Sequence, residues 1–189
     1  MNSGHHLQPD PCTLWVWRHP KPQGAAGRCI GRTDLPVDPR RAKRLAHRIQ
    51  SAARREQLPR EVWTSPLARG REVGLWLARQ GFRLHVDARL AELDFGRWDG
   101  LPWSRIAAQE VAQWEADFLH HRPGGGESLA GLMQRVREFL QERTVPGSAL
   151  LVVGHAGWMQ AAACLHGPAP SASTWPRAPA YGSLLHRVV

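Results

Sequence analysis

The sequence is poor in the residues that mark disulfide-stabilised and membrane-spanning proteins. Its three cysteines, Cys12, Cys29 and Cys164, are odd in number, widely spaced and without a CxxC arrangement. This pattern indicates neither a disulfide framework nor a zinc site. No apolar run approaches the roughly 18 residues of a membrane span, and the first residues lack the basic start and apolar stretch of a signal peptide. We therefore expect no membrane partner and a location in the reducing cytoplasm.

Lysine is almost absent, and acidic residues are fewer than basic ones. Lys21 and Lys43 are the only lysines, so arginine supplies nearly all of the 25 basic residues, which face 16 acidic residues and give a formal net charge of +9. A basic balance favours anionic partners, either nucleic acid or small phosphates, and charge alone does not choose between them. The arginines are spread along stretches such as residues 39–55, which is typical of a solvated helix surface. A non-enzymatic, basic nucleic-acid-binding module therefore stays open as an alternative function, although nucleic acid is not the partner we expect.

The remaining composition is that of an ordinary globular protein. Hydrophobic residues make up 42% and charged residues 22% of the 189 residues, which fits one domain with a full core. We expect residues 1–12, with His5 and His6, to be a disordered tail that binds no metal. Residues 13–189 contain no repeat or linker and are expected to form a single domain.

Short apolar runs alternate with helical stripes along the chain. The runs predict strands at residues 13–17, 61–65, 83–87, 148–157 and 183–189. Asp38 and Pro39 resemble the cap and first position of a helix, and Ser65 and Pro66 repeat that pattern before a helix that stops at Gly81. Further helices are predicted over residues 128–143 and 158–165. The alternation predicts an α/β sandwich with a mostly parallel sheet.

Cationic and imidazole side chains stand where the predicted strands end. Arg18 and His19 follow the first strand, Ser65 ends the second strand four residues before Arg69, and His155 lies at the end of the long apolar strand. In open α/β sheets the ligand crevice lies beyond the carboxyl ends of the strands. Several cations at one sheet edge need a counter-charge. The sequence therefore predicts an anion site there, and a phosphate would supply the charge.

Six ordered motifs resemble one known family. They are "WVWRHP", "GRTDLPVDPRRAKRLA", "TSPLARGRE", "LAELDFGRWDG", "PGGGES" and "LLVVGHAG", which span residue 13 to about residue 158. Their order and spacing are similar to those of the histidine phosphatase superfamily, which includes cofactor-dependent phosphoglycerate mutase. The short length, "RHP" and "GRCIGRTDLP" most resemble the bacterial alpha-ribazole phosphatase branch. The resemblance implies a three-layer α/β/α sandwich of the phosphoglycerate mutase type and a phosphomonoesterase that needs no metal or other cofactor.

The resemblance also implies a role for each matching residue. It makes His19 the nucleophile that becomes phosphohistidine and Glu92 the proton donor, with Asp94 as the weaker candidate for that role. The phosphoryl oxygens would be bound by three side chains: Arg18, Arg69 and His155. This set agrees with the chemistry, because phosphoryl transfer needs an in-line nucleophile and a positively charged cradle that arginine forks can supply.

The chain departs from the family pattern next to the nucleophile. Many members have glycine directly after the nucleophilic histidine and asparagine six residues after it, where this chain has Pro20 and Ala25. Proline has no backbone N–H to offer a phosphate. We therefore expect other residues to complete the substrate-binding shell, namely Arg28, Gly31, Arg32, Thr33 and Ala156. Trp98 and Trp103 follow Glu92 closely, and a place in the core and a place in the wall of the leaving-group pocket are equally open for them.

The expected reaction is hydrolysis of a small phosphorylated metabolite, with inorganic phosphate as product. Alpha-ribazole 5'-phosphate is the single best guess at the substrate. A mutase-type phosphotransferase and a protein phosphohistidine phosphatase are alternatives within the same family, although the chain lacks the insertions that enclose a bisphosphate in the resembling mutases. A homodimer is left open.

Overall fold

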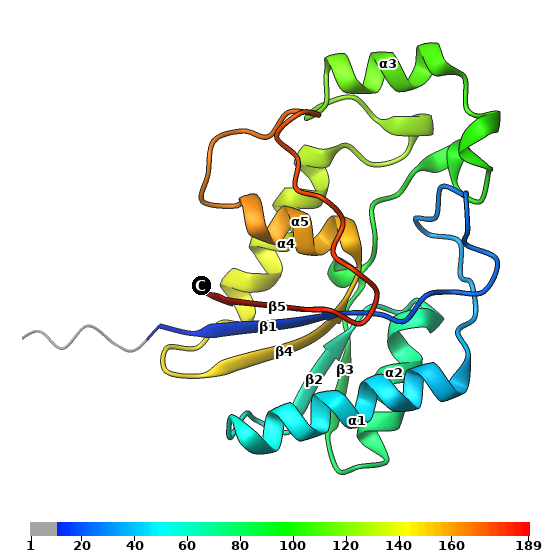
Figure 1. The fold of residues 1–189 in the computed structure, drawn as a ribbon. Helices are drawn as coiled ribbons and strands as arrows, with labels where there is room; N and C mark the ends of the chain where they lie inside the picture. Colours follow the sequence, from blue (N-terminus) through cyan, green and yellow to red (C-terminus); the bar gives the residue numbers. More distant parts are fainter. Residues whose placement is uncertain (1–10) are drawn as a thin grey trace, which may run out of the picture.

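The structure is a computed structural model that describes residues 11–189 (Figure 1). Its centre is a five-stranded sheet with the strand order β3-β2-β4-β1-β5. The strands are β1 (Thr13–Arg18), β2 (Glu61–Thr64), β3 (Arg83–Val86), β4 (Ala149–Gly154) and β5 (Leu184–Val188). Only β5, at one edge, is antiparallel to its neighbour, and the other pairings are parallel. The predicted, mostly parallel α/β sheet is confirmed.

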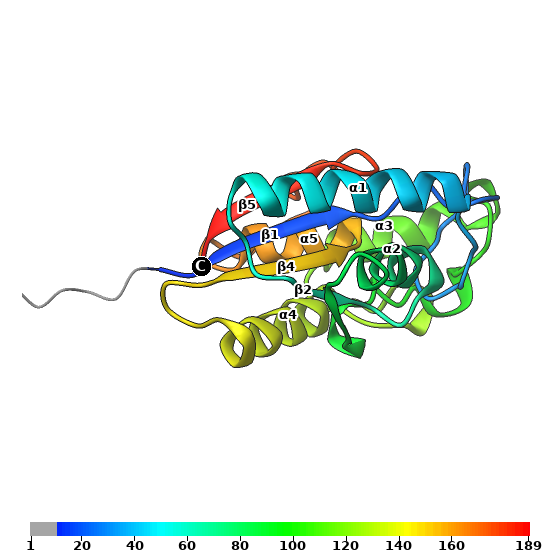
Figure 2. The same cartoon turned by 90° about the horizontal axis from the view of Figure 1, so that it is seen from below.

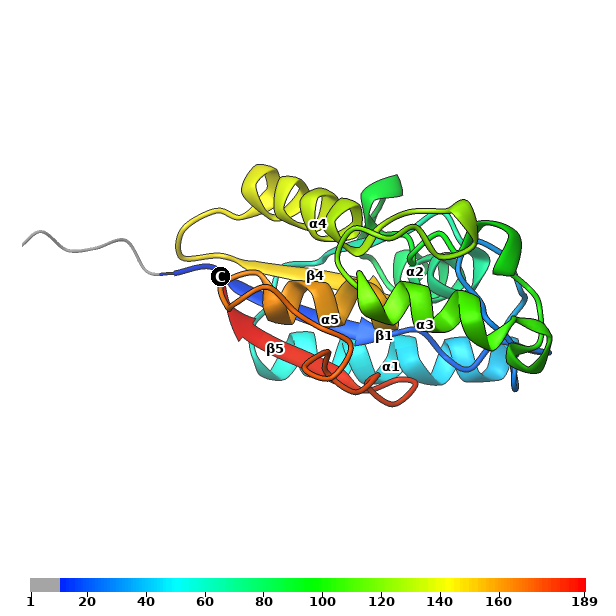
Figure 3. The same cartoon turned by 90° about the horizontal axis from the view of Figure 1, so that it is seen from above.

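Helices cover both faces of this sheet, so the fold is the expected three-layer sandwich. Helices α1 (Pro39–Arg55) and α2 (Ala68–Ala78) pack on one face, and α4 (Leu129–Arg143) and α5 (Ala156–Cys164) pack on the other. The view from below shows α1 running along the strands (Figure 2). Helix α3 (Ala108–Ala116) lies beyond the tip of β1 in the view from above (Figure 3). The chain between β3 and α4 also contains four 3₁₀ turns: η1 (Ala88–Leu90), η2 (Gly96–Trp98), η3 (Trp103–Arg105) and η4 (Pro123–Gly125).

Strand β1 explains why its sequence is a continuous apolar run. Side chains alternate between the two faces of a strand. Accordingly, Leu14 and Val16 pack in the core under α4 and α5, and Trp15 and Trp17 pack in the core under α1 and α2. A strand that is covered on both faces has no solvated side. Polar side chains can therefore begin only where the strand ends, at Arg18 and beyond.

Helix α1 begins as its sequence predicts. The Asp38 side chain caps the helix, because its Oδ1 accepts the backbone N–H of Arg40 at 2.8 Å, and Pro39 is the first helical residue. The buried face carries Ala42, Leu45, Ala46 and Ile49 among others, at helical spacing.

Two predicted helix starts are wrong by two residues. Helix α2 begins at Ala68 without a side-chain cap, not directly after Ser65 and Pro66, because the Ser65 hydroxyl contacts a histidine at the end of β4. Helix α5 begins at Ala156, before Trp158, since the chain turns into the helix directly after β4.

The N-terminal prediction is only in part within the described structure. Residues 1–10, with His5 and His6, lie outside the described residues. Cys12, which the sequence places in the tail, is instead buried in the core under α4 and α5, with 3% of its surface exposed. Cys12, Cys29 and Cys164 are all free thiols. Within residues 11–189, no helix combines the length and the apolar character needed to cross a membrane.

Candidate active site

Strands β1 and β4 bring two histidines together at the carboxyl edge of the sheet. The strands are parallel neighbours in which Arg18 pairs with Gly154, so the residues that follow, His19 and His155, emerge side by side. Their ring centroids are 4.8 Å apart, and the backbone N–H of His19 donates to the Gly154 carbonyl at 3.0 Å. Both imidazoles are buried, with exposed fractions of 3% for His19 and 0% for His155. The register of two strands thus positions the pair.

The hydrogen bonding of His19 determines which ring nitrogen is available for chemistry. Its Nδ1 lies 2.7 Å from the Pro20 carbonyl oxygen, which can only accept, so Nδ1 carries the proton and donates. Nε2 is then left with a free lone pair. Burial and the nearby positive charges of Arg69 and Arg18 lower the His19 pKa to about 3, although the Pro20 carbonyl opposes the shift. His19 is therefore a neutral imidazole with Nε2 as a potential nucleophile.

His155 is held by a hydroxyl and has one ring nitrogen to spare. Its Nε2 lies 2.7 Å from Ser65 Oγ, and that oxygen also accepts the backbone N–H of Leu67 at 3.3 Å. Its Nδ1 is buried and has no hydrogen-bond partner in the part of the chain that the structure describes. Burial is the main cause that lowers the His155 pKa well below its usual value, and the neighbouring His19 and Arg69 lower it further. Ser65 Oγ accepts the N–H of Leu67 and still has a hydroxyl proton to donate. In the tautomer in which this hydroxyl donates to His155 Nε2, the ring proton is on Nδ1, where it is an unsatisfied N–H that a ligand oxygen would satisfy.

Two arginines supply positive charge around this pair. Arg69, on the first turn of α2, is 1% exposed, and its Nη2 and Nη1 donate to the carbonyls of Gly31 and Thr33 at 2.5 and 2.8 Å. Arg18 donates from Nη1 to the carbonyl of Pro179, and its Cζ lies 3.9 Å above the ring of Tyr181. Burial lowers the pKa of both guanidiniums, and the charge of Glu92 opposes this for both.

Glu92, in the loop between η1 and η2, is directed towards the same group of histidine and arginine side chains. Its Oε1 accepts the N–H of Leu93 at 3.0 Å and its Oε2 accepts the N–H of Gly157, in the first turn of α5, at 3.2 Å. A side chain at position 157 would collide with Glu92 Oε1, so glycine is required for this approach. The alternative acid, Asp94, turns instead to the backbone N–H of Gly96 at 2.8 Å.

A cleft of about 360 Å³ opens beside these groups. Arg18 and Glu92 line it, as do Arg28 and Ala156 of the expected substrate shell. The rest of the wall is mainly apolar and aromatic: Ala25, Ile30, Leu93, Phe95, Trp103, Trp114, Phe118, Leu129, Leu132, Gly157, Gln160, Trp175, Ala178 and Tyr181. Trp103 is thus in the wall, whereas Trp98 is 2% exposed and packs in a small core cluster.

The loop of residues 31–33 does not offer its backbone to the cleft. The N–H groups of Gly31, Arg32 and Thr33 all donate to the carboxylate of Asp99, and the Thr33 hydroxyl donates to Asp99 Oδ1 at 2.6 Å. None of the three residues lines the cleft. The backbone donors of these residues are therefore already bound by a half-buried carboxylate, and the expected place of the three residues in the substrate shell stays a prediction. Gly31 and Thr33 instead fix Arg69 through their carbonyls.

The sequence did not reveal every residue of the site. Tyr181 lies 5.6 Å from His19 between ring centroids and stacks on Arg18, although it belongs to a Pro/Gly-rich loop with no motif. It is the only tyrosine of the chain, which is the one signal the sequence offered. The sequence predicts a helix cap at Ser65 and predicts no role for Asp99.

The chain belongs to the histidine phosphatase superfamily (branch 1), whose sequence profile matches residues 14–186. Among residues 11–189, no group of three or more His, Cys, Asp or Glu side chains is arranged to hold a metal ion.

Proteins with phosphatase and mutase names are similar to this chain. Phosphoserine phosphatase 1 of Hydrogenobacter thermophilus is 28% identical over 144 residues, which cover 71% of this chain and 68% of that protein. A second phosphoserine phosphatase-named protein of the same organism is 31% identical over 109 residues, 55% of this chain and 54% of its own length, so the chain spans about half of that relative. The crystal structure of a phosphoglycerate mutase from Thermus thermophilus has a TM-score of 0.61 with 28% identity and covers 79% of this chain and 81% of that one. A mycobacterial glucosyl-3-phosphoglycerate phosphatase has a TM-score of 0.73 at 24% identity, covering 92% of this chain and 88% of that one, which is a likeness of fold.

Proposed function

We propose that the protein is a phosphomonoesterase that works through a phosphohistidine on His19 and needs no metal. One observation carries the proposal: Nδ1 of His19 is committed to the Pro20 carbonyl, so Nε2 is an unprotonated, buried nucleophile next to a second histidine with a free Nδ1. Phosphatase names among the relatives support the same reaction.

In the first step Nε2 of His19 attacks the phosphorus of the monoester, and the bond from phosphorus to the leaving oxygen breaks. Negative charge spreads over the phosphoryl oxygens, where Arg18, Arg69 and the Nδ1–H of His155 would bind it. Glu92, in its carboxylic acid form, gives its proton to the leaving oxygen, so the alcohol departs neutral.

The second step releases phosphate. The Glu92 carboxylate takes a proton from a water molecule, and the water oxygen attacks the phosphorus of phosphohistidine. The N–P bond breaks and its electron pair returns to Nε2 of His19. The Nδ1–H bond to Pro20 holds the ring in the same orientation throughout, so the neutral nucleophile is restored.

The cleft beside Glu92 supports a substrate with an apolar, planar leaving group. Aromatic rings of Phe95, Trp103, Trp114 and Trp175 line the place where the alcohol would sit, and such rings stack on planar groups. Alpha-ribazole 5'-phosphate, which carries an aromatic base, is the specific substrate that we propose. The names of the relatives favour O-phosphoserine, which is small and zwitterionic. It matches this cleft less well, because the wall is mainly apolar and Arg28 is its one cation besides Arg18.

The first test is hydrolysis of p-nitrophenyl phosphate in excess EDTA. Turnover at an undiminished rate is expected, and loss of activity that returns with added metal would overturn the metal-independent mechanism. The second test compares kcat/KM for alpha-ribazole 5'-phosphate and O-phosphoserine, with Trp103→Ala as the variant. We expect alpha-ribazole 5'-phosphate to be preferred and Trp103→Ala to reduce that preference. A preference for phosphoserine that Trp103→Ala leaves unchanged would reject the proposed substrate.

The role of Glu92 is tested by the leaving group. Glu92→Gln keeps the shape of the side chain but has no proton to give, so kcat/KM for an alkyl phosphate should fall by roughly 10²–10⁴-fold and that for an aryl phosphate much less. Glu115→Gln, an exposed glutamate on α3, is the matched control and should change neither. Equal losses on both substrates for Glu92→Gln would show that another group, with Asp94 first in line, is the acid.

A further inference from the structure

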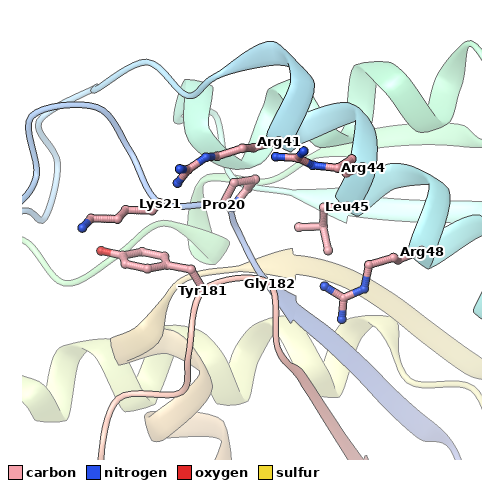
Figure 4. Close-up of a pocket in the computed structure, with 8 residues that line it drawn as sticks. All are labelled: Pro20, Lys21, Arg41, Arg44, Leu45, Arg48, Tyr181 and Gly182. Carbon is pink, nitrogen blue, oxygen red and sulfur yellow. The ribbon is translucent and has the colours of Figure 1, made fainter.

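A second hollow, separate from the catalytic cleft, lies between α1 and the chain around Tyr181 (Figure 4). It has a volume of about 350 Å³. We call it the α1 groove, and eight residues line it: Pro20, Lys21, Arg41, Arg44, Leu45, Arg48, Tyr181 and Gly182. Figure 4 shows the three arginines along α1, facing the segment of Tyr181 and Gly182 across the hollow, with Lys21 at one end.

The α1 groove concentrates positive charge without a carboxylate among its lining residues. Lys21, Arg41, Arg44 and Arg48 are all exposed, and none of them forms an ion pair within residues 11–189. Asp38 lies in an adjoining hollow with Lys21 and Arg41, but its Oδ1 already accepts the N–H that begins α1. The groove therefore presents four cations to solvent.

The positive charges of α1 repel one another and destabilise the helix. The helix carries seven lysine and arginine residues and no acidic residue. Arg41, Arg44 and Arg48 follow one another at spacings of three and four residues, so they stand on one face over about 10 Å of helix. Like charges at these spacings destabilise a helix. A bound anion would remove the repulsion, and guanidinium forks match the geometry of phosphate oxygens.

The α1 groove adjoins the catalytic residues without being part of their cleft. Pro20 directly follows His19, and Tyr181 lines both hollows. The ring of Tyr181 also lies 5.6 Å from the ring of His19. One aromatic side chain therefore stands between a hollow with an apolar wall and a hollow with a cationic wall.

We propose that the α1 groove is a second anion-binding site, whose ligand is a compact oligophosphate that carries several adjacent negative charges. A single phosphate would engage only part of four cations, whereas linked phosphates would engage all of them. The concave shape and the volume fit a small molecule. The site stands independently of the proposed phosphatase activity, because it needs none of the catalytic side chains.

The test is calorimetric titration with inorganic tripolyphosphate in EDTA, in the His19→Ala background so that no turnover consumes the probe. The groove variant is Arg44→Gln with Arg48→Gln. The matched control is Arg40→Gln with Arg54→Gln, which removes the same charge from exposed positions of the same helix outside the groove. Thermal unfolding of each variant verifies that the fold is retained.

We expect tripolyphosphate to bind at least about tenfold more tightly than orthophosphate, and the groove variant to lose about tenfold or more of that affinity, since two charge-assisted contacts are removed. The control should retain the parent affinity within about threefold. Adenosine triphosphate in place of tripolyphosphate distinguishes a nucleotide source from an inorganic one, and groove-dependent binding of either supports the site.

Three results would overturn the proposal. The first is equal loss in the groove and control variants, which would indicate a diffuse effect of net charge. The second is an equal affinity for orthophosphate and tripolyphosphate. The third is groove-dependent binding of a single-stranded oligonucleotide that is tighter than that of tripolyphosphate and increases with length, which would identify a nucleic-acid surface instead. None of these outcomes depends on whether p-nitrophenyl phosphate is hydrolysed.

Discussion

Acidification should destabilise the protein through His19. The folded chain keeps this imidazole neutral, since burial and the charges of Arg69 and Arg18 lower its pKa from 6.5 to about 3. In the unfolded chain the pKa returns to its ordinary value. Between pH 6.5 and pH 3 the unfolded state therefore binds more protons than the folded state, so stability rises with pH in this window and is lost as the pH falls.

The size of the effect follows from the two pKa values. At pH 7.5 both states are almost wholly neutral, and His19 contributes nothing to the pH dependence. At pH 5 the unfolded imidazole is protonated and the folded one is not. One pKa unit corresponds to about 1.4 kcal/mol, and pH 5 lies about 1.5 units below the unfolded pKa, so the loss at pH 5 is about 2 kcal/mol.

Urea unfolding at pH 7.5 and pH 5.0 measures this loss, in buffers free of phosphate because a bound anion would stabilise the fold. Between the two pH values the wild type should lose about 2 kcal/mol more free energy of unfolding than His19→Gln. His47→Gln removes an exposed imidazole of α1 and should lose as much as the wild type. Equal losses for the wild type and His19→Gln would mean that the folded protein protonates His19, which would refute the neutral nucleophile.

Three further substitutions test contacts around the site. Ser65→Ala removes the hydroxyl that holds His155 and leaves a buried ring nitrogen unpaired, which should lower the free energy of unfolding by about 1–3 kcal/mol in urea titrations and reduce kcat/KM. Asp99→Asn weakens the charge-assisted hydrogen bonds to the loop of residues 31–33 and should lower the free energy of unfolding by about 1.5–3 kcal/mol in the same urea titrations. The added methyl group of Gly157→Ala would collide with Glu92 Oε1, so kcat/KM for an alkyl phosphate should fall more than that for an aryl phosphate. Equal falls would show that Gly157 does not act through Glu92.

The fold could be predicted from the sequence, and so could the sheet edge at which the site residues converge, because both depend on regular strand geometry. A continuous apolar run such as β1 can only be a strand that is covered on both faces, and parallel strands end at one edge. Arg18 is the last residue of β1, and His19 and His155 directly follow β1 and β4. Their convergence is therefore a consequence of strand pairing, not of any contact between side chains.

The contacts that could not be predicted join residues far apart in the chain. Ser65 has the local signature of a helix cap, and its hydroxyl could satisfy either a backbone N–H or a distant imidazole. The amides of residues 31–33 could equally have bound a phosphate, and Asp99 binds them instead. Tyr181 reaches the nucleophile from a loop without periodicity, so no pattern in the sequence connects it to His19.

The most direct measurement of the mechanism is to trap the covalent intermediate. The wild type would be mixed with a ³²P-labelled aryl phosphate in EDTA, quenched within one turnover, and the labelled residue identified. A phosphoenzyme that is labile in acid, stable in alkali, formed and lost as fast as turnover, and absent from His19→Ala is the expected result. Turnover by the wild type without any labelled protein, or a label that persists in His19→Ala, would contradict phosphoryl transfer through His19.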